Sequence, residues 1–140
     1  MMKRLMLSVA LLVVAGVQAG ELKLQLDGKG LAGNQIRVAV YSANMPEQFP
    51  SGEEFYRGTM IEATADQLVV TVQNLPPGKY AVAAYVDNNK NGKQDKNIFG
   101  VPTEMYGFSN GARGIFGPPD FSAAEFEVGE SVVSKSIQLH

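Results

Sequence analysis

The sequence predicts an all-β protein, an antiparallel β-sandwich of about seven strands with an immunoglobulin-like architecture. Along most of the chain, apolar and polar residues alternate with a period of two, which is the pattern of strands with one buried face. Turn residues separate these segments at short intervals, as in β-sandwiches. No segment has the strand, helix, strand order of a parallel βαβ unit.

The first 19 residues have the features of a secretory signal peptide. Lys3 and Arg4 precede an apolar run from Leu5 to Val17, and Ala19 ends a small-residue cleavage pattern. The alternative is a membrane anchor, but the run is shorter than the roughly 20 residues that span a bilayer. We therefore expect a periplasmic or secreted protein with no membrane span after cleavage, in which residues 20–140 form a single β-sandwich domain.

Seven segments with strand patterns follow in order. In the first, Leu22, Leu24 and Leu26 share one face and polar residues take the other. The expected strands are residues 21–27, 34–42, 58–64, 67–75, 75–87, 123–129 and 131–139.

The connections between these segments also carry signals. Ala65-Asp66 predicts a tight hairpin between the third and fourth strands, and Gly129-Glu130 predicts a closing hairpin between the last two. Lys135 interrupts the apolar face of the last strand, which indicates a bulge or a sheet edge. Ser51 and Glu54 have the spacing of a capping box and predict a short helix.

Composition excludes several classes of function. The chain has no cysteine and one histidine, His140, which we expect to be frayed at the end of the chain. Catalytic triads, Cys/His pairs and histidine-rich zinc sites are therefore excluded. Without Lys3 and Arg4 the chain has 10 basic and 14 acidic side chains and no run of like charges, so nucleic acid is not an expected partner.

The segment DNNKNGKQD, residues 87–95, has the spacing of a calcium loop. Oxygen-bearing residues alternate, and Gly92 occupies the position where such loops turn sharply. Glu104, in the next segment, is a candidate for the last ligand. The predicted Ca²⁺ ligands are Asp87, Asn89, Asn91, the Lys93 carbonyl, Asp95 and Glu104. The alternative is a turn in which Asn and Asp side chains bond to their own backbone.

Residues 98–121 form a segment too irregular for a strand and too apolar for a solvated loop. Arg113 is the only basic residue between Lys96 and Lys135, so it is the candidate to bind a carboxylate, phosphate or sugar hydroxyl. Tyr106 and Phe108 are the candidate stacking faces. The alternative is that Arg113 pairs with an acidic neighbour while the aromatic residues close one end of the sandwich. The candidate neighbours are Glu104 and Asp120.

Four motifs identify a family resemblance that extends over residues 20–140. They are LPPGxYAV, DxNxNGxxD, GxPxExYGFSN and ARGxFGPPxF, all from Leu75 onward. The chain resembles the bacterial exported proteins of domain of unknown function 2141, which implies a small β-domain with no assigned activity.

A second resemblance concerns the calcium-like loop. LPPGKYAV followed by YVDNNKNGKQD is similar to the prealbumin-like B-type repeats of bacterial surface proteins, in which this loop binds calcium. The positions that carry over are Asp87, Asn89, Asn91 and Asp95. Those repeats commonly continue with Gly-Glu, whereas this chain continues with Lys96-Asn97-Ile98-Phe99, so the resemblance does not supply the last ligand.

The sequence thus predicts a non-enzymatic exported domain that binds Ca²⁺ in the 87–95 loop and a peptide, glycan or envelope protein through the 98–121 loop. Two alternatives stay open. One is a hydrolytic enzyme that uses Arg113 with a nearby carboxylate, for which the candidates are Glu104, Asp120 and Glu125. The other is a structural accessory domain of the envelope without a metal.

Overall fold

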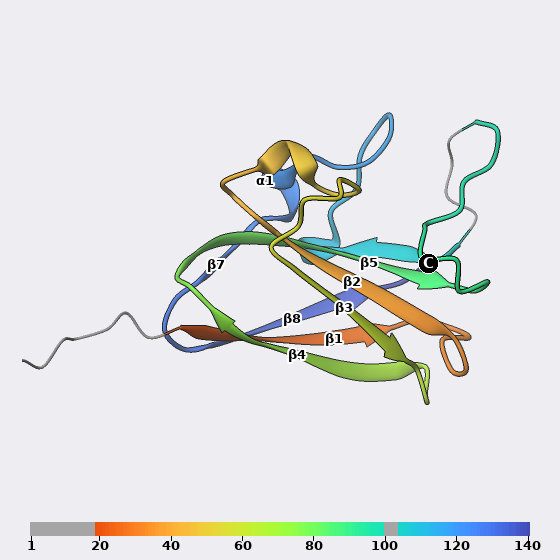
Figure 1. Cartoon of the computed structure of the whole chain (residues 1–140), viewed down its shortest axis with the longest axis horizontal. Coiled ribbons are helices and arrows are strands. Elements are labelled where there is room, and N and C mark those ends of the chain that lie inside the picture. The colour runs from red at the N-terminus through yellow and green to blue at the C-terminus, as the bar shows by residue number, and fades with distance from the viewer. Residues whose placement is uncertain (1–18, 100–103) are drawn as a thin grey trace, which may run out of the picture.

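The computed structural model describes residues 19–99 and 104–140, so all but the last residue of the predicted signal peptide lies outside it. Eight strands of this described chain form two sheets that pack face to face (Figure 1). The all-β sandwich is confirmed. The smaller sheet has the order β4 (Gln67–Leu75), β1 (Gly20–Asp27), β8 (Val132–Gln138). The larger sheet has the order β3 (Arg57–Glu62), β2 (Gln35–Ser42), β5 (Gly78–Asp87), β6 (Tyr106–Phe108), and β7 (Phe126–Val128) also pairs with β5.

Pairing is antiparallel between these strands, with one exception. β1 and β8 run parallel, so that Leu24 lies opposite Lys135 and Leu26 opposite Ile137. β8 is an edge strand, which confirms the interpretation of Lys135 as a residue at a sheet edge.

The core lies between the sheets and follows the alternation in the sequence. Leu22, Leu24 and Leu26 of β1 are fully buried, and Val38 and Val82 face them from the larger sheet. Burial of each such side chain stabilises the fold by about 1.5 to 3 kcal/mol. The period-two pattern of the sequence therefore indicates correctly which face of each strand is buried.

Both predicted hairpins are wrong. β3 belongs to the larger sheet and β4 to the smaller, so the turn at Ala65-Asp66 crosses between the sheets. There the Asp66 carboxylate accepts a hydrogen bond of 3.0 Å from the backbone N–H of Ala32. Gly129-Glu130 likewise leads from β7, on the larger sheet, to β8, on the smaller. A short turn between two strands is compatible with a hairpin or with a sheet change, and the sequence does not distinguish them.

Three smaller expectations also need correction. β6 adds an eighth strand inside the segment expected to be irregular. The short helix expected at residues 51–54 is absent, and a 3₁₀ helix, η1 (Pro46–Gln48), lies before it. His140 is not frayed, because its backbone exchanges two hydrogen bonds of 3.1 Å with Tyr106.

A second apolar cluster covers part of the outer face of the larger sheet. Tyr41 and Ala83 on the strands pack with Phe49, just after η1, and with Phe121 of the short helix α1 (Phe121–Ala124). The Tyr41 and Phe49 rings meet edge to face at 5.6 Å. The rest of this outer face is open, and the candidate site lies there.

Candidate functional site

The 87–95 loop begins at the buried end of β5. Asp87 is fully buried and accepts hydrogen bonds from Arg37 Nε at 3.0 Å, Gly92 N at 2.8 Å and Asn91 N at 3.2 Å. Burial raises the pKa of Asp87, but the Gly92 N–H, the Arg37 guanidinium and the Asn91 N–H together outweigh it, so the pKa is below its usual value. Asp87 is thus held as a carboxylate at the base of the loop.

The asparagines of the loop bond within the loop itself. The side-chain amides of Asn89 and Asn91 donate to the Asp95 carboxylate at 2.5 and 2.8 Å. The Asn91 N–H donates to Asn89 Oδ1, and the Lys93 N–H donates to Asn91 Oδ1 at 2.9 Å. These side-chain to backbone bonds are the turn chemistry of the alternative interpretation.

Glu104 lies beside this loop, where the sequence placed it. Its side chain is 6% exposed; Oε2 accepts from Asn88 N at 2.7 Å and Oε1 from Asp95 N at 2.8 Å. The carboxylate therefore joins the start and the end of the loop. A role as the last calcium ligand stays a prediction.

The donor types in the loop suit a hard cation such as Ca²⁺, which prefers carboxylate, amide and carbonyl oxygens. Within residues 19–99 and 104–140, no group of three or more Asp, Glu, His or Cys side chains is arranged to hold a metal. Calcium in this loop would need the amides of Asn89 and Asn91 to turn their oxygens toward it, because their nitrogens now face Asp95.

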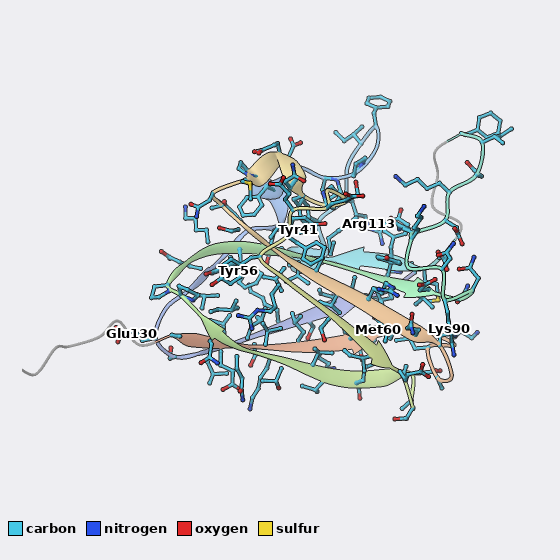
Figure 2. The ribbon with its side chains drawn as sticks, viewed as in Figure 1. Tyr41, Tyr56, Met60, Lys90, Arg113 and Glu130 are labelled. Atoms are coloured by element: carbon cyan, nitrogen blue, oxygen red, sulfur yellow. The ribbon has the colours of Figure 1, made fainter. Side chains whose placement is uncertain are left out.

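The structure brings Arg113, Tyr106 and Phe108 together around one hollow of about 760 Å³. Tyr106 and Phe108 are two residues apart on β6, so both rings lie on the outer face of the larger sheet, with centroids 5.6 Å apart. The Arg113 guanidinium donates to Nε2 of His140 at 2.9 Å. Figure 2 shows Arg113 and Tyr41 on the same side of the larger sheet.

A second hollow of about 670 Å³ adjoins the first and shares Tyr106, Phe108 and Lys96 with it. It extends over the open part of the larger sheet, past Met60 and Tyr85, to the 87–95 loop. Charged residues around the two hollows are mainly basic. They are Arg37, Lys93, Lys96 and Arg113, with Glu53 as the acidic residue among the described lining.

The carboxylates proposed as neighbours of Arg113 lie elsewhere. In the part of the chain that the structure describes, Arg113 forms no ion pair with Glu104 or Asp120. Glu125 lies 3.8 Å from Lys79 instead. The structure thus brings Arg113 together with the aromatic residues and not with the candidate acids.

Sequence reasoning missed three residues that organise the site. Arg37 occupies an outward, polar position of β2 and gave no sign of pairing with Asp87. The terminal position of His140 predicts a frayed residue and gives no signal for its contact with Arg113. Ser109 is buried, and its Oγ accepts from Val82 N at 2.9 Å and donates to Ala124 O at 2.6 Å. On β5, Val82 lies between the residues that pair with β6 and those that pair with β7, and Ser109 supplies a hydrogen-bond partner there in place of a strand.

The fold and the loops define a small β-sandwich domain with a basic, aromatic hollow on the outer face of its larger sheet. Residues 27–136 match the family model described as an uncharacterized protein conserved in bacteria, domain of unknown function 2141. The chain belongs to this family. No curated protein and no solved structure matches the chain. No helix among the described residues is both long enough and apolar enough to cross a membrane.

Proposed function

We propose that this protein is an exported, non-enzymatic binding domain of the periplasm or the extracellular space. The hollow at Tyr106, Phe108 and Arg113 binds a ligand that combines a negatively charged group with a flat apolar face. The observation that carries the proposal is the convergence of these three residues on one hollow of about 760 Å³ with a basic lining. Pockets of this size are typical of sites for small ligands.

Each residue has a defined part in such a site. The guanidinium is a planar donor with no acceptor, so Arg113 suits a carboxylate or phosphate, and His140 orients it from one side. Tyr106 and Phe108 offer ring faces on which a sugar ring or a planar side chain stacks. A glycan with uronic acids and an acidic peptide both have this chemistry.

The test is calorimetric titration with three probes: a tetrasaccharide of uronic acids, a neutral tetrasaccharide of equal length and an acidic tetrapeptide. We expect binding of an anionic probe, at least about tenfold weaker in Arg113→Gln or Tyr106→Ala. Lys23→Gln, on the exposed face of the smaller sheet, is the matched control and keeps full affinity. No binding of either anionic probe, or equal binding by all variants, would overturn the proposal.

We further propose that Ca²⁺ binds in the 87–95 loop and fixes the wall of the adjoining hollow that carries Lys93 and Lys96. The support is the set of alternating oxygen donors between Asp87 and Asp95 and the position of that loop along the hollow. Loops of this kind outside the cell bind with dissociation constants of about 10⁻⁴ to 10⁻³ M. About 10 mM Ca²⁺ should then stabilise the protein by about 1.4 to 2.7 kcal/mol.

Thermal melts in Ca²⁺, Mg²⁺ and chelator check the metal. We expect a rise in Tm with Ca²⁺ that is absent in Asn91→Ala and retained in Asn44→Ala, an exposed asparagine outside the loop. An unchanged Tm in Ca²⁺ would overturn the calcium proposal and leave the loop as a turn held by hydrogen bonds without a metal.

A further inference from the structure

Two loops of the domain repeat a pattern of a cation, one further residue, then Ile-Phe-Gly. The first is Lys96-Asn97-Ile98-Phe99-Gly100 and the second is Arg113-Gly114-Ile115-Phe116-Gly117. In both, the isoleucine and phenylalanine are almost entirely in solvent. The exposed fractions are 94% for Ile98, 83% for Phe99, 91% for Ile115 and 100% for Phe116. These are the highest exposures among the large apolar side chains of the described chain.

Local structure holds the apolar pairs away from the body of the domain. Gly114 and Gly117 approach so closely that a Cβ on Gly114 would collide with the Gly117 carbonyl, which makes the second loop a tight turn with Ile115-Phe116 at its tip. In the first loop the Phe99 N–H donates to Asn97 Oδ1 at 2.9 Å, so this tip is also a turn. The local backbone structure of each loop therefore keeps its Ile-Phe pair exposed at the tip.

The two tips stand on the same side of the molecule. The teal segment that includes residues 93–99 and the blue loop of residues 113–118 both rise from the larger sheet, away from the smaller one (Figure 1). Phe99 and Phe116 both line the hollow of about 760 Å³. One flat surface can thus meet both tips together.

From these observations we propose that the Ile98-Phe99 and Ile115-Phe116 tips insert into the surface of an anionic lipid bilayer. A protein partner would need two separate pockets matched to two separate loops, whereas a bilayer accepts any apolar tip that reaches it. Lys96 and Arg113 each precede their tip by two residues, which places a cation at headgroup depth when the ring reaches the acyl chains. The basic lining of the hollow between the tips adds to this attraction in a chain of net charge −2.

The absence of tryptophan from the sequence gives a direct test. Phe99→Trp and Phe116→Trp each place a single reporter at one tip, and Val69→Trp places one at an exposed apolar position on the smaller sheet. Vesicles of phosphatidylcholine with phosphatidylglycerol in a two-to-one ratio are the probe. We expect a blue shift and quenching by brominated acyl chains for both tip reporters and no change for Val69→Trp.

Vesicle flotation measures the energetics. Phe99→Ser/Phe116→Ser should bind these vesicles at least about tenfold more weakly than the unaltered protein, since each ring contributes through its buried apolar area. Val69→Ser is the matched control and binds as the unaltered protein does. Binding should weaken for pure phosphatidylcholine and at about 1 M salt, where the screening length falls to roughly 3 Å.

Absence of vesicle binding, or equal binding by the double tip variant, would overturn the inference, and capture of a protein through the tips without vesicle binding would do so too. The substituted side chains are all mostly exposed, so unchanged circular dichroism is expected for all variants. Phe99 and Phe116 also line the hollow, so the anionic probes are titrated into the double tip variant as well. Loss of vesicle binding with retained probe binding separates the membrane contact from the ligand site at Tyr106 and Arg113.

Discussion

Replacement of Glu104 by glutamine tests how the 87–95 loop is held. The carboxylate accepts two backbone N–H bonds, from Asn88 at 2.7 Å and from Asp95 at 2.8 Å, while almost fully buried. Glutamine has one acceptor oxygen, so one of the two backbone N–H groups keeps a neutral acceptor. The other N–H faces the side-chain NH₂ group, which is itself a donor, and loses its hydrogen bond. A hydrogen bond to a charged acceptor contributes about 1.5 to 3 kcal/mol, and a neutral one about 0.5 to 1.5 kcal/mol.

Two charged bonds are replaced by one neutral bond, so the expected loss for Glu104→Gln is about 2 to 5 kcal/mol in the free energy of unfolding. Urea denaturation followed by circular dichroism measures this loss, with chelator present. Glu127→Gln removes the same charge from an exposed position of β7 and should change stability by less than about 0.5 kcal/mol. A loss below about 0.5 kcal/mol for Glu104→Gln, or equal losses for both variants, would refute the description of Glu104 as the clamp of the loop.

The same variant separates the clamp from a calcium ligand. If Glu104 only joins Asn88 and Asp95, the stabilisation by Ca²⁺ should survive in Glu104→Gln at a lower absolute stability. If Glu104 completes the calcium shell, that stabilisation should disappear. The two roles therefore predict different slopes of Tm against calcium concentration.

Three further predictions concern residues around the site. Ser109→Ala should destabilise the fold by about 1 to 3 kcal/mol in urea denaturation, because Val82 N and Ala124 O lose a buried partner; a Ser134→Ala control should have little effect. The pKa of Asp87 is lowered in the folded protein, so its carboxylate stabilises the fold above the ordinary aspartate pKa, and this stabilisation is lost as pH falls through the pKa of the folded state. The difference in unfolding free energy between the unaltered protein and Asp87→Asn should therefore shrink from pH 7 to below about pH 4. A constant difference would contradict this. Burial raises the pKa of Tyr41 to about 12, so Tyr41→Phe should remove the last step of the alkaline absorbance titration.

The sequence predicted the strands well because the fold buries one face of each. Gln67–Leu75 was predicted to the residue, and β1, β2 and β5 to within a few residues. Strand partners were not predictable in the same way. The alternation in β3 and β4 is satisfied equally by a hairpin and by a crossing between sheets, since both arrangements bury the same side chains.

In the site too, contacts between residues close in sequence were predictable, and contacts between distant residues were not. The grouping of Tyr106 with Phe108 follows from their spacing on a strand, and the position of Glu104 beside the 87–95 loop was expected from its place in the next segment. Arg37 lies 50 residues before Asp87 in the sequence, and only the register of β2 against β5 brings them together. No local pattern contains that register.

The clamp at Glu104 connects the calcium-like loop with the proposed membrane contact. The Asp95 N–H donates to Glu104 Oε1, so these two residues lie side by side. The Ile98-Phe99 tip thus follows, three residues later, a backbone position that the Glu104 carboxylate holds. If calcium stiffens the 87–95 loop, it stiffens this position as well, and binding to vesicles should pay less conformational entropy. Calcium should therefore strengthen the vesicle binding of the unaltered protein more than that of Glu104→Gln, and equal strengthening in both would show that the clamp does not transmit order to the tip.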